Sequence, residues 1–358
     1  MMVLFRSVLL KSGLYMAGLI GLGACVTPGI DYTAEIAPGN PQAAQLRSVA
    51  VERFRGPLAG WYADQFEDML GQADFNGQPW FQVGLFSRQS NVAGVYAGEV
   101  EINRPSVDER YHTYSTCVET DKETKKCIKK KEVEKVCLDY SIDVAVTPQL
   151  LDVRTNKIVH SKTYYASDSE QECFETGHVE YRVRREPGDK GKGTYRFAYD
   201  DYSRPGYRLG GDRIIDRITA NALNSTIWQA RQDIAPYNQQ VRAKILAKAE
   251  SPAVAADPRF KLAVDGIRNR QLGYACQTFT ELADDYPDAP AVLHNLGACA
   301  EASGESGSAQ GYYAEAAAAA HAMGDAPAER IKNALERISG TRTNEVILDS
   351  LVPGGPAY

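Results

Sequence analysis

Seven cysteines carry most of the reactive chemistry that the sequence offers. A cysteine thiol can bind a metal, form a disulfide or accept a covalent group. Nine residues separate Cys117 from Cys127 and Cys127 from Cys137, so the short Cys-x-x-Cys spacing of zinc sites is missing. The histidines form no metal-binding pair and adjoin no GxSxG or phosphate-loop motif. We therefore expect no metal site, no cofactor, no catalytic residue and no enzymatic activity.

Cys25 differs from the other six cysteines because it ends the first apolar stretch of the chain. Arg6 and Lys11 precede a run from Gly13 to Leu22 that consists of apolar or small residues. The run is shorter than the ~20 residues that a membrane helix needs, and its basic start is typical of a secretory signal. An ordinary signal peptide cut near a chance cysteine would look similar.

The four residues Leu22-Gly23-Ala24-Cys25 resemble the bacterial lipobox, in which the cysteine receives diacylglycerol before signal peptidase cuts in front of it. The resemblance implies that residues 1–24 are a lipoprotein signal peptide and that Cys25 carries acyl chains, palmitate among them. Two or more chains suffice for stable anchoring. Val26, in place of an Asp, implies transport to the outer membrane, with the protein mainly in the periplasm.

Export sets the state that we expect for the remaining cysteines. They are even in number and would enter an oxidising compartment, so we expect three disulfides. Four of them, Cys117, Cys127, Cys137 and Cys173, allow three connectivities, and the sequence does not choose among them.

Charge narrows the class of partner. The full chain has 40 basic and 46 acidic residues. Removal of residues 1–24 takes away Arg6 and Lys11, so 38 basic residues remain and the formal charge is −8. That balance argues against a nucleic-acid partner. No other segment approaches the ~20 apolar residues of a membrane helix, so membrane attachment would depend on the lipid.

Elements of a mixed sheet follow the signal. A buried strand is expected at 49–54, an amphipathic helix at 58–70 and a second strand at 80–86, and this order indicates a parallel pair. Residues 140–147 alternate apolar and polar, as a half-buried strand does. A hairpin is expected at 150–165, turning at Asn156, and an apolar stripe of residues predicts a closing helix from about Asp212 to Arg231: Ile214, Ile215, Ile218, Ala222, Leu223, Ile227 and Trp228.

These elements resemble the curli-secretion CsgG family, whose periplasmic fold also occurs in the N-terminal domain of TolB and in lipoprotein activators of penicillin-binding proteins. The short specific part is the hairpin Leu151-Asp152-Val153-Arg154-Thr155-Asn156-Lys157-Ile158-Val159, where the family usually has Gly at the Asn156 position. The resemblance implies an α/β (α+β) CsgG/TolB-N-like domain with a mixed sheet over 46–235, after a tether at 25–45.

Two insertions interrupt this domain, at about 108–139 and 170–210. Residues 111–139 mix lysines with acidic residues around three cysteines, which predicts a solvated, disulfide-pinned hairpin or a surface for lipopolysaccharide phosphates or acidic peptidoglycan groups. Residues 178–202 alternate in a two-residue period, which favours a soluble Tyr-rich contact hairpin, with a membrane hairpin as the alternative. The Gly-rich segment 188–193 reads as its flexible tip.

A repeat signal marks the C-terminal part. In a 34-residue frame starting at Ala256, the tetratricopeptide pattern matches strongly from Leu293 to Ala316 and more weakly before it. The resemblance implies an all-α domain of tetratricopeptide repeats and a cap at 256–340, with a linker at 236–255 and a tail at 341–358. The cap helix is expected from Pro327 to Ile338.

The repeat frame yields one disulfide and one candidate groove. Cys276 and Cys299 fall on helices that pack as antiparallel neighbours, so we expect them to be bonded. The positions that would face a partner-binding groove are Phe260, Val264, Ile267, His294, Ala298 and Glu301. Packing of the first three against the closing helix of the first domain is the alternative.

Two functions remain open. The resemblances favour a non-enzymatic outer-membrane lipoprotein that acts as a scaffold or assembly subunit of an envelope complex for secretion or a surface appendage. Such a subunit would form homo-oligomers and recruit periplasmic or outer-membrane proteins through its tetratricopeptide repeats. The alternative is a lipoprotein regulator of a peptidoglycan synthase.

Overall fold

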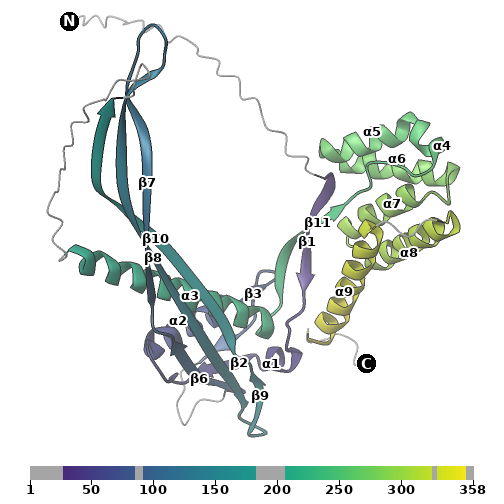
Figure 1. The fold of residues 1–358 in the computed structure, drawn as a ribbon. Helices are drawn as coiled ribbons and strands as arrows, with labels where there is room; N and C mark the ends of the chain where they lie inside the picture. The colour runs from purple at the N-terminus through teal and green to yellow at the C-terminus, as the bar shows by residue number, and fades with distance from the viewer. Residues whose placement is uncertain (1–26, 85–91, 183–205, 325–328, 352–358) are drawn as a thin grey trace, which may run out of the picture. The chain divides into compact units, whose positions relative to one another are not determined.

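A computed structural model describes residues 27–84, 92–182, 206–324 and 329–351, with side chains described outside 176–182 and 206–211 (Figure 1). The chain forms two compact units. The helical unit holds the residues up to Tyr32 together with Gln240–Ser339. The sheet unit holds Thr33–Gln239 together with the residues from Gly340 onward.

The sheet unit is built on a seven-stranded mixed sheet with the path β10-β8-β6-β2-β5. Strand β2 (Ser48–Val51) lies parallel to β5 (Gln82–Val83) and β6 (Gly94–Ile102). The long β8 (Cys127–Asp152) lies antiparallel to four strands: β6, β7 (Ser106–Thr120), β9 (Lys157–Ser161) and β10 (Tyr164–Arg182). Strands β3 (Asp74–Phe75) and β4 (Gln78–Pro79) pair separately.

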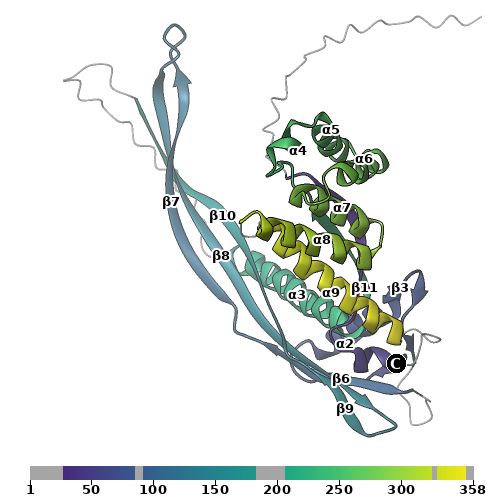
Figure 2. The ribbon, with the colours of Figure 1, turned by 90° about the vertical axis from the view of Figure 1, so that its right-hand side faces the viewer.

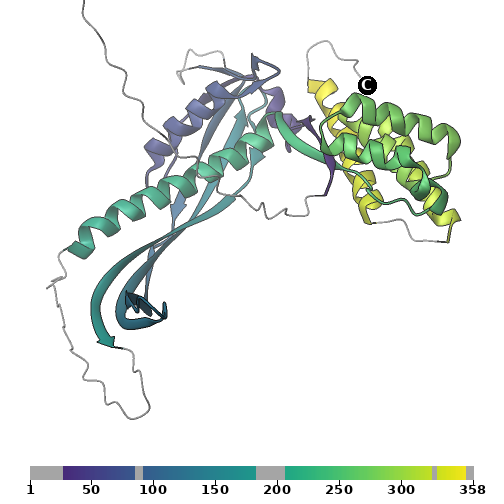
Figure 3. The same ribbon diagram turned by 90° about the horizontal axis from the view of Figure 1, so that it is seen from above.

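Helices α2 (Ala59–Gln72) and α3 (Gly206–Ile234) cover one face of this sheet, as Figure 3 shows, and α1 (Pro41–Gln45) packs into the same core. Tyr62 and Phe66 of α2 meet Tyr96 of β6, and Ile218 of α3 joins Tyr140 of β8 in that core. Large apolar side chains thus fill the space between helices and sheet, which is the main stabilising contribution of this layer.

Several sequence expectations for this unit agree with the structure. Residues 140–147 lie on β8, and the even-numbered ones face the core. The hairpin after β8 turns at Asn156 with a φ of 53°, a conformation that Asn tolerates. Of the strand expected at 80–86, Gln82–Val83 form β5, Trp80 and Phe81 are buried beside it, and residues 85–86 lie outside the described chain. Trp228 differs from its prediction, since its side chain is 65% exposed on α3.

The helical unit contains successive helices joined by short loops. They are α4 (Pro252–Ala256), α5 (Pro258–Arg268), α6 (Leu272–Asp285), α7 (Pro290–Ala302), α8 (Ser306–Ala322) and the first part of α9 (Glu329–Leu351). Gly297 allows α7 and α8 to approach closely, because a Cβ there would lie 2.6 Å from the Tyr313 ring. In its coarser form, the predicted order of a mixed sheet and then helices agrees with this fold.

The expected tether, linker and tail contain regular structure instead. Residues 25–45 were expected to be extended, yet they include β1 (Gly29–Ile36) and α1, and β1 pairs with β11 (Tyr237–Lys244) inside the expected linker 236–255. Helix α9 continues to Leu351 through the expected tail, and Leu351 is buried in the sheet unit's core. Pairing between residues 200 positions apart leaves no local periodicity to detect. Among the described residues, no helix has the length and apolarity needed to cross a bilayer.

Candidate functional site: a disulfide-linked ribbon

The most exposed part of the sheet unit is a three-stranded ribbon formed by β7, residues 127–141 of β8 and residues 169–182 of β10. Within it β8 is the central strand. Figures 1 and 2 show these strands extending past α3. Strand β7 has 15 residues, so at about 3.3 Å per residue it spans about 50 Å.

The ribbon is continuous with the core sheet because β6 and β7 follow each other along one edge of β8. Ile102 at the end of β6 faces Val144, and Ser106 at the start of β7 faces Ser141. Between them, the Asn103 amide donates to the Asp143 carbonyl at 3.0 Å, while Pro105 has no amide to donate. The buried half of β8 therefore holds the ribbon by its base.

Side chains of β7 remain in solvent on both faces of the ribbon, since all 15 of its residues are exposed. Four of them are large and apolar or aromatic, with exposed fractions of 46% for Val107, 74% for Tyr111, 43% for Tyr114 and 47% for Val118. The edge of β7 away from β8 pairs with no strand in the described part of the chain. Such an edge presents backbone groups to an incoming strand.

Two disulfides compensate for the small core of the ribbon. Cys117–Cys127 joins the ends of β7 and β8 next to their turn. Cys137–Cys173 joins β8 to β10 at positions that lie directly opposite each other in the register. The four cysteines whose pairing the sequence left open are thus used to hold three strands together. Residues 111–139 form a hairpin pinned by a disulfide, which is the first of the two structures expected for this insertion.

Polar side chains reinforce the ribbon and attach it to α3. The Tyr114 hydroxyl on β7 donates to Glu175 on β10 at 2.8 Å, and this hydrogen bond raises the pKa of Tyr114. Near the base, Arg217 of α3 donates two hydrogen bonds to Glu170 of β10. Because these groups are exposed, they fix orientation more than they add stability.

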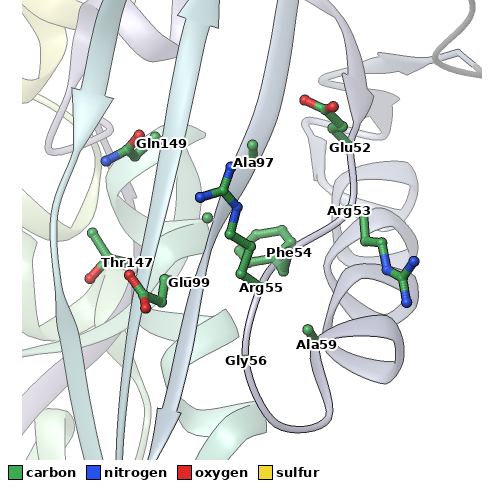
Figure 4. A pocket seen from close by; sticks show the side chains of 11 residues that line it. Glu52, Arg53, Phe54, Arg55, Gly56, Ala59, Ala97, Glu99, Thr147 and Gln149 are labelled. Carbon is green, nitrogen blue, oxygen red and sulfur yellow. The ribbon is translucent and has the colours of Figure 1, made fainter.

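A polar pocket of about 740 Å³ lies between the segment that leads into α2, with Ala59 at the start of that helix, and strands β6 and β8 (Figure 4). Glu99 of β6 and Gln149 of β8 line it, together with Arg55, whose guanidinium makes no hydrogen bond to another described residue. The Thr147 hydroxyl is engaged with Thr163 at 2.8 Å. The lining can form ion pairs and hydrogen bonds with a partner and contains no serine, cysteine or histidine nucleophile.

The positions expected to line a tetratricopeptide groove are all buried, which corrects that expectation. Their exposed fractions are 4% or less: Phe260, Val264, Ile267, His294, Ala298 and Glu301. Residues of the helical unit itself occupy the space, including Ile30 of β1, Ala243 of β11, Leu246 and Ile331 of α9, all in one apolar cluster with Phe260. A short repeat array exposes a large apolar face, and here the chain covers its own.

Glu301 and His294 are held by polar contacts in that interior. Arg337 donates to both Glu301 oxygens at 2.6 and 2.7 Å, and the hydroxyls of Tyr32 and Tyr313 donate at 2.5 and 2.6 Å. Burial opposes ionisation of Glu301, but these donors outweigh it and its pKa is lowered. His294 bonds the Lys244 carbonyl through Nε2 at 2.9 Å, and burial lowers its pKa to about 4.

The remaining predicted site residues divide into two groups. Cys276 and Cys299 are bonded between α6 and α7, the pair that the repeat frame indicated. Cys25 lies outside the described residues, as does most of the expected hairpin 178–202, of which only the backbone at 178–182 is described, paired with β8. Arg337 and Tyr32 were not anticipated, because no local pattern links positions so far apart in the chain.

Comparisons with known proteins give weak likenesses. No family model matches the chain, and no curated protein matches it. Among solved structures, a protein described as a lipoprotein from Caulobacter crescentus CB15 matches with a TM-score of 0.22 and 14% identity, over 55% of this chain and 92% of that one.

A neuraminyllactose-binding hemagglutinin homolog from Helicobacter pylori matches with a TM-score of 0.24 and 12% identity, over 56% of this chain and 88% of its own. The hypothetical protein CT253 from Chlamydia trachomatis matches with a TM-score of 0.19 and 12% identity, over 52% and 96%. At TM-scores this low, the likenesses carry no argument about this chain.

Proposed function

We propose that the chain is a non-enzymatic, outer-membrane lipoprotein with a CsgG-like sheet unit and tetratricopeptide-type helices. It acts as a scaffold or assembly subunit of an envelope complex and associates with further copies of itself. The ribbon is the observation that carries this proposal, because it is long, rigidified by two disulfides and exposed along all of β7.

The ribbon gains little stability from burial within its own unit. A 15-residue strand with four exposed large side chains buries little apolar area within its own unit. Its open edge and its Val107, Tyr111, Tyr114 and Val118 side chains offer hydrogen bonds and apolar area to a second protein. Partner contacts are therefore assigned to the ribbon and not to the covered positions of the helical unit.

The membrane anchor is the second part of the proposal. Cys25 would carry acyl chains, since it follows the Leu22-Gly23-Ala24 sequence and an apolar stretch. Replacing Cys25 with Ser should move the protein from the outer-membrane fraction to the soluble periplasmic fraction. An intact mass without acyl groups on the wild-type protein would refute the anchor.

Assembly is tested by gentle detergent extraction of native membranes, followed by mass measurement and imaging. The wild type should form a multisubunit ring or cluster. The assembly formed by the double variant Tyr111→Lys and Val118→Lys should have a lower mass than that of the wild type, because two charges would be buried at the contact. Val346→Lys, at a position 62% exposed on α9, serves as the matched control and should assemble normally.

A wild-type protein that is extracted only as a monomer would contradict the assembly proposal. If that monomer carries a peptidoglycan synthase with it, the protein is instead a regulator of that enzyme. Assembly that survives both ribbon substitutions would place the contacts elsewhere.

A further inference from the structure

A second pocket, of about 500 Å³, lies between α2 and α3 in the sheet unit. Its floor is apolar and buried, with Met69 from α2 and Ile227 from α3. Trp228 of α3 and Tyr237 at the start of β11 line it, and the Trp228 side chain is 65% exposed. The volume lies within the range of small-molecule sites.

Amide side chains surround this aromatic pair. None of them makes a side-chain hydrogen bond within the described part of the chain, and they come from α2, α3 and β11: Gln65, Gln72, Asn224, Gln232 and Asn238. Each amide offers two N–H donors and one carbonyl acceptor. The rim is therefore matched to a ligand that presents donors and acceptors together, as hydroxyl groups do.

Charge disfavours anionic ligands in the pocket. Arg231 is its one basic lining residue, and the guanidinium is buried. It donates to the backbone carbonyls of Ala235, Pro236 and Asp74 at 3.1, 2.7 and 3.1 Å. The N–H donors of that cation are used by backbone groups, and with Asp68 and Asp74 the lining carries a formal charge of −1, which favours a neutral ligand over a phosphate or a carboxylate.

We infer that this pocket is a binding site for a short, neutral oligosaccharide. One face of a pyranose ring carries C–H groups that pack on an indole, and its hydroxyls both donate and accept hydrogen bonds. The exposed Trp228 supplies the flat apolar surface, the amides supply the hydrogen-bonding rim, and the net formal charge of the lining is −1. This activity is separate from the assembly proposed for the ribbon and does not depend on it.

The test uses the full chain in a detergent without a sugar headgroup. Tri-N-acetylchitotriose and maltotriose are titrated by calorimetry and by tryptophan fluorescence, and the Trp228→Ala variant separates the Trp228 signal from those of the half-buried Trp61 and the buried Trp80. We expect one saturable site for at least one trisaccharide. A preference for the chitotriose would point to N-acetylated glycans such as those of the cell wall, and a preference for maltotriose to unacetylated ones.

Variants assign the binding to this pocket. Trp228→Ala and Asn224→Ala should each weaken binding at least about tenfold, which is the loss of about 1.4 kcal/mol of contact. Tyr165→Ala removes another exposed aromatic ring, 72% exposed on β10 and outside the pocket, and should leave binding unchanged. Thermal unfolding of each variant checks that the fold is retained.

The inference is overturned if neither trisaccharide binds at about 10 mM, a concentration that would detect even a weak site. Full binding by both pocket variants would also overturn it, as would an equal loss in the Tyr165→Ala control. Assembly on the ribbon can succeed or fail in any of these cases, so the two proposals are tested separately.

Discussion

At the scale of single residues, Glu301 is a buried carboxylate of the helical unit that accepts four hydrogen bonds. Its side chain is 1% exposed and accepts from Arg337, Tyr32 and Tyr313. Glu301→Gln would remove the carboxylate charge from a buried ion pair with Arg337, so we expect a loss of about 3–5 kcal/mol in the free energy of unfolding. Urea titration followed by circular dichroism measures this.

The exposed Glu315 on the neighbouring helix α8 provides the matched control. Glu315→Gln should change the free energy of unfolding by less than about 0.5 kcal/mol. Combining Glu301→Gln with Arg337→Met should recover part of the loss, since the positive charge that Glu301 balances is then removed as well. Equal effects of Glu301→Gln and Glu315→Gln would show that the buried ion pair contributes little.

His294 makes stability depend on pH. Its Nε2–H donates to the Lys244 carbonyl, so Nδ1 is the atom that would take a proton, and Nδ1 is buried with no hydrogen-bond partner among the described residues. The pKa falls from 6.5 in the unfolded chain to about 4 in the fold. The unfolded state therefore binds the extra proton first, and stability present above pH 6.5 is lost as the pH falls toward 4.

The expected loss from His294 is about 3 kcal/mol over that pH range, at about 1.4 kcal/mol per pKa unit. His294→Gln cannot titrate, so the difference in unfolding free energy between wild type and variant should shrink from pH 7 to pH 4.5. Chemical denaturation at both pH values measures it. Parallel pH profiles for the two proteins would disprove the assignment.

At the scale of elements, the two ribbon disulfides act on different lengths of chain. Cys117–Cys127 closes a separation of 10 residues near the turn, and Cys137–Cys173 closes 36 residues nearer the core. Replacing Cys117 and Cys127 with Ser should accelerate amide hydrogen exchange in β7 and in the adjoining part of β8 while leaving the core residues of α2 and α3 protected.

The matching change at Cys137 and Cys173 should loosen more of the ribbon and lower the free energy of unfolding by about 2–4 kcal/mol, because it releases the longer loop. Hydrogen exchange read by mass spectrometry distinguishes the two variants. Identical exchange maps would mean that the strands hold the ribbon without the bonds.

Helices and strands with a strong local periodicity could be predicted from the sequence, whereas which of their side chains are exposed could not. The alternation at 140–147 and the stripe from Ile214 to Ile227 predict a strand and a helix that the structure contains. Trp228 was assigned to the same apolar stripe. It directly follows the buried Ile227, and because successive helix residues point about 100° apart, its side chain lies in solvent at the edge of the stripe. Burial of Phe260 and His294 depends on strands from distant parts of the sequence, which no window of neighbouring residues reveals.

At the scale of the whole molecule, each unit is assembled from two separate stretches of the chain. In the helical unit, Arg242 bonds both carboxylate oxygens of Asp31 at 3.0 Å, and the amide of Ile245 donates to the Pro28 carbonyl at 3.0 Å. Residues 27–32 are therefore part of a folded unit. Strand β1 begins at Gly29, four residues after the expected lipidation site Cys25.

Because each unit uses two separate stretches of the chain, the order in which the units can fold during synthesis is restricted. A ribosome or an export channel delivers the chain from its N-terminus, so Ile30 and Tyr32 emerge about 200 residues before the strand and helices that enclose them. The core of the sheet unit is also completed late, since Leu348 and Leu351 at the C-terminal end of α9 belong to it. The helical unit is incomplete until Ser339 has been delivered and the sheet unit until Leu351, so the first unit along the chain cannot be finished before the second begins to form. Apolar side chains that these late residues cover, in both units, therefore stay exposed until residues 240–351 have been delivered.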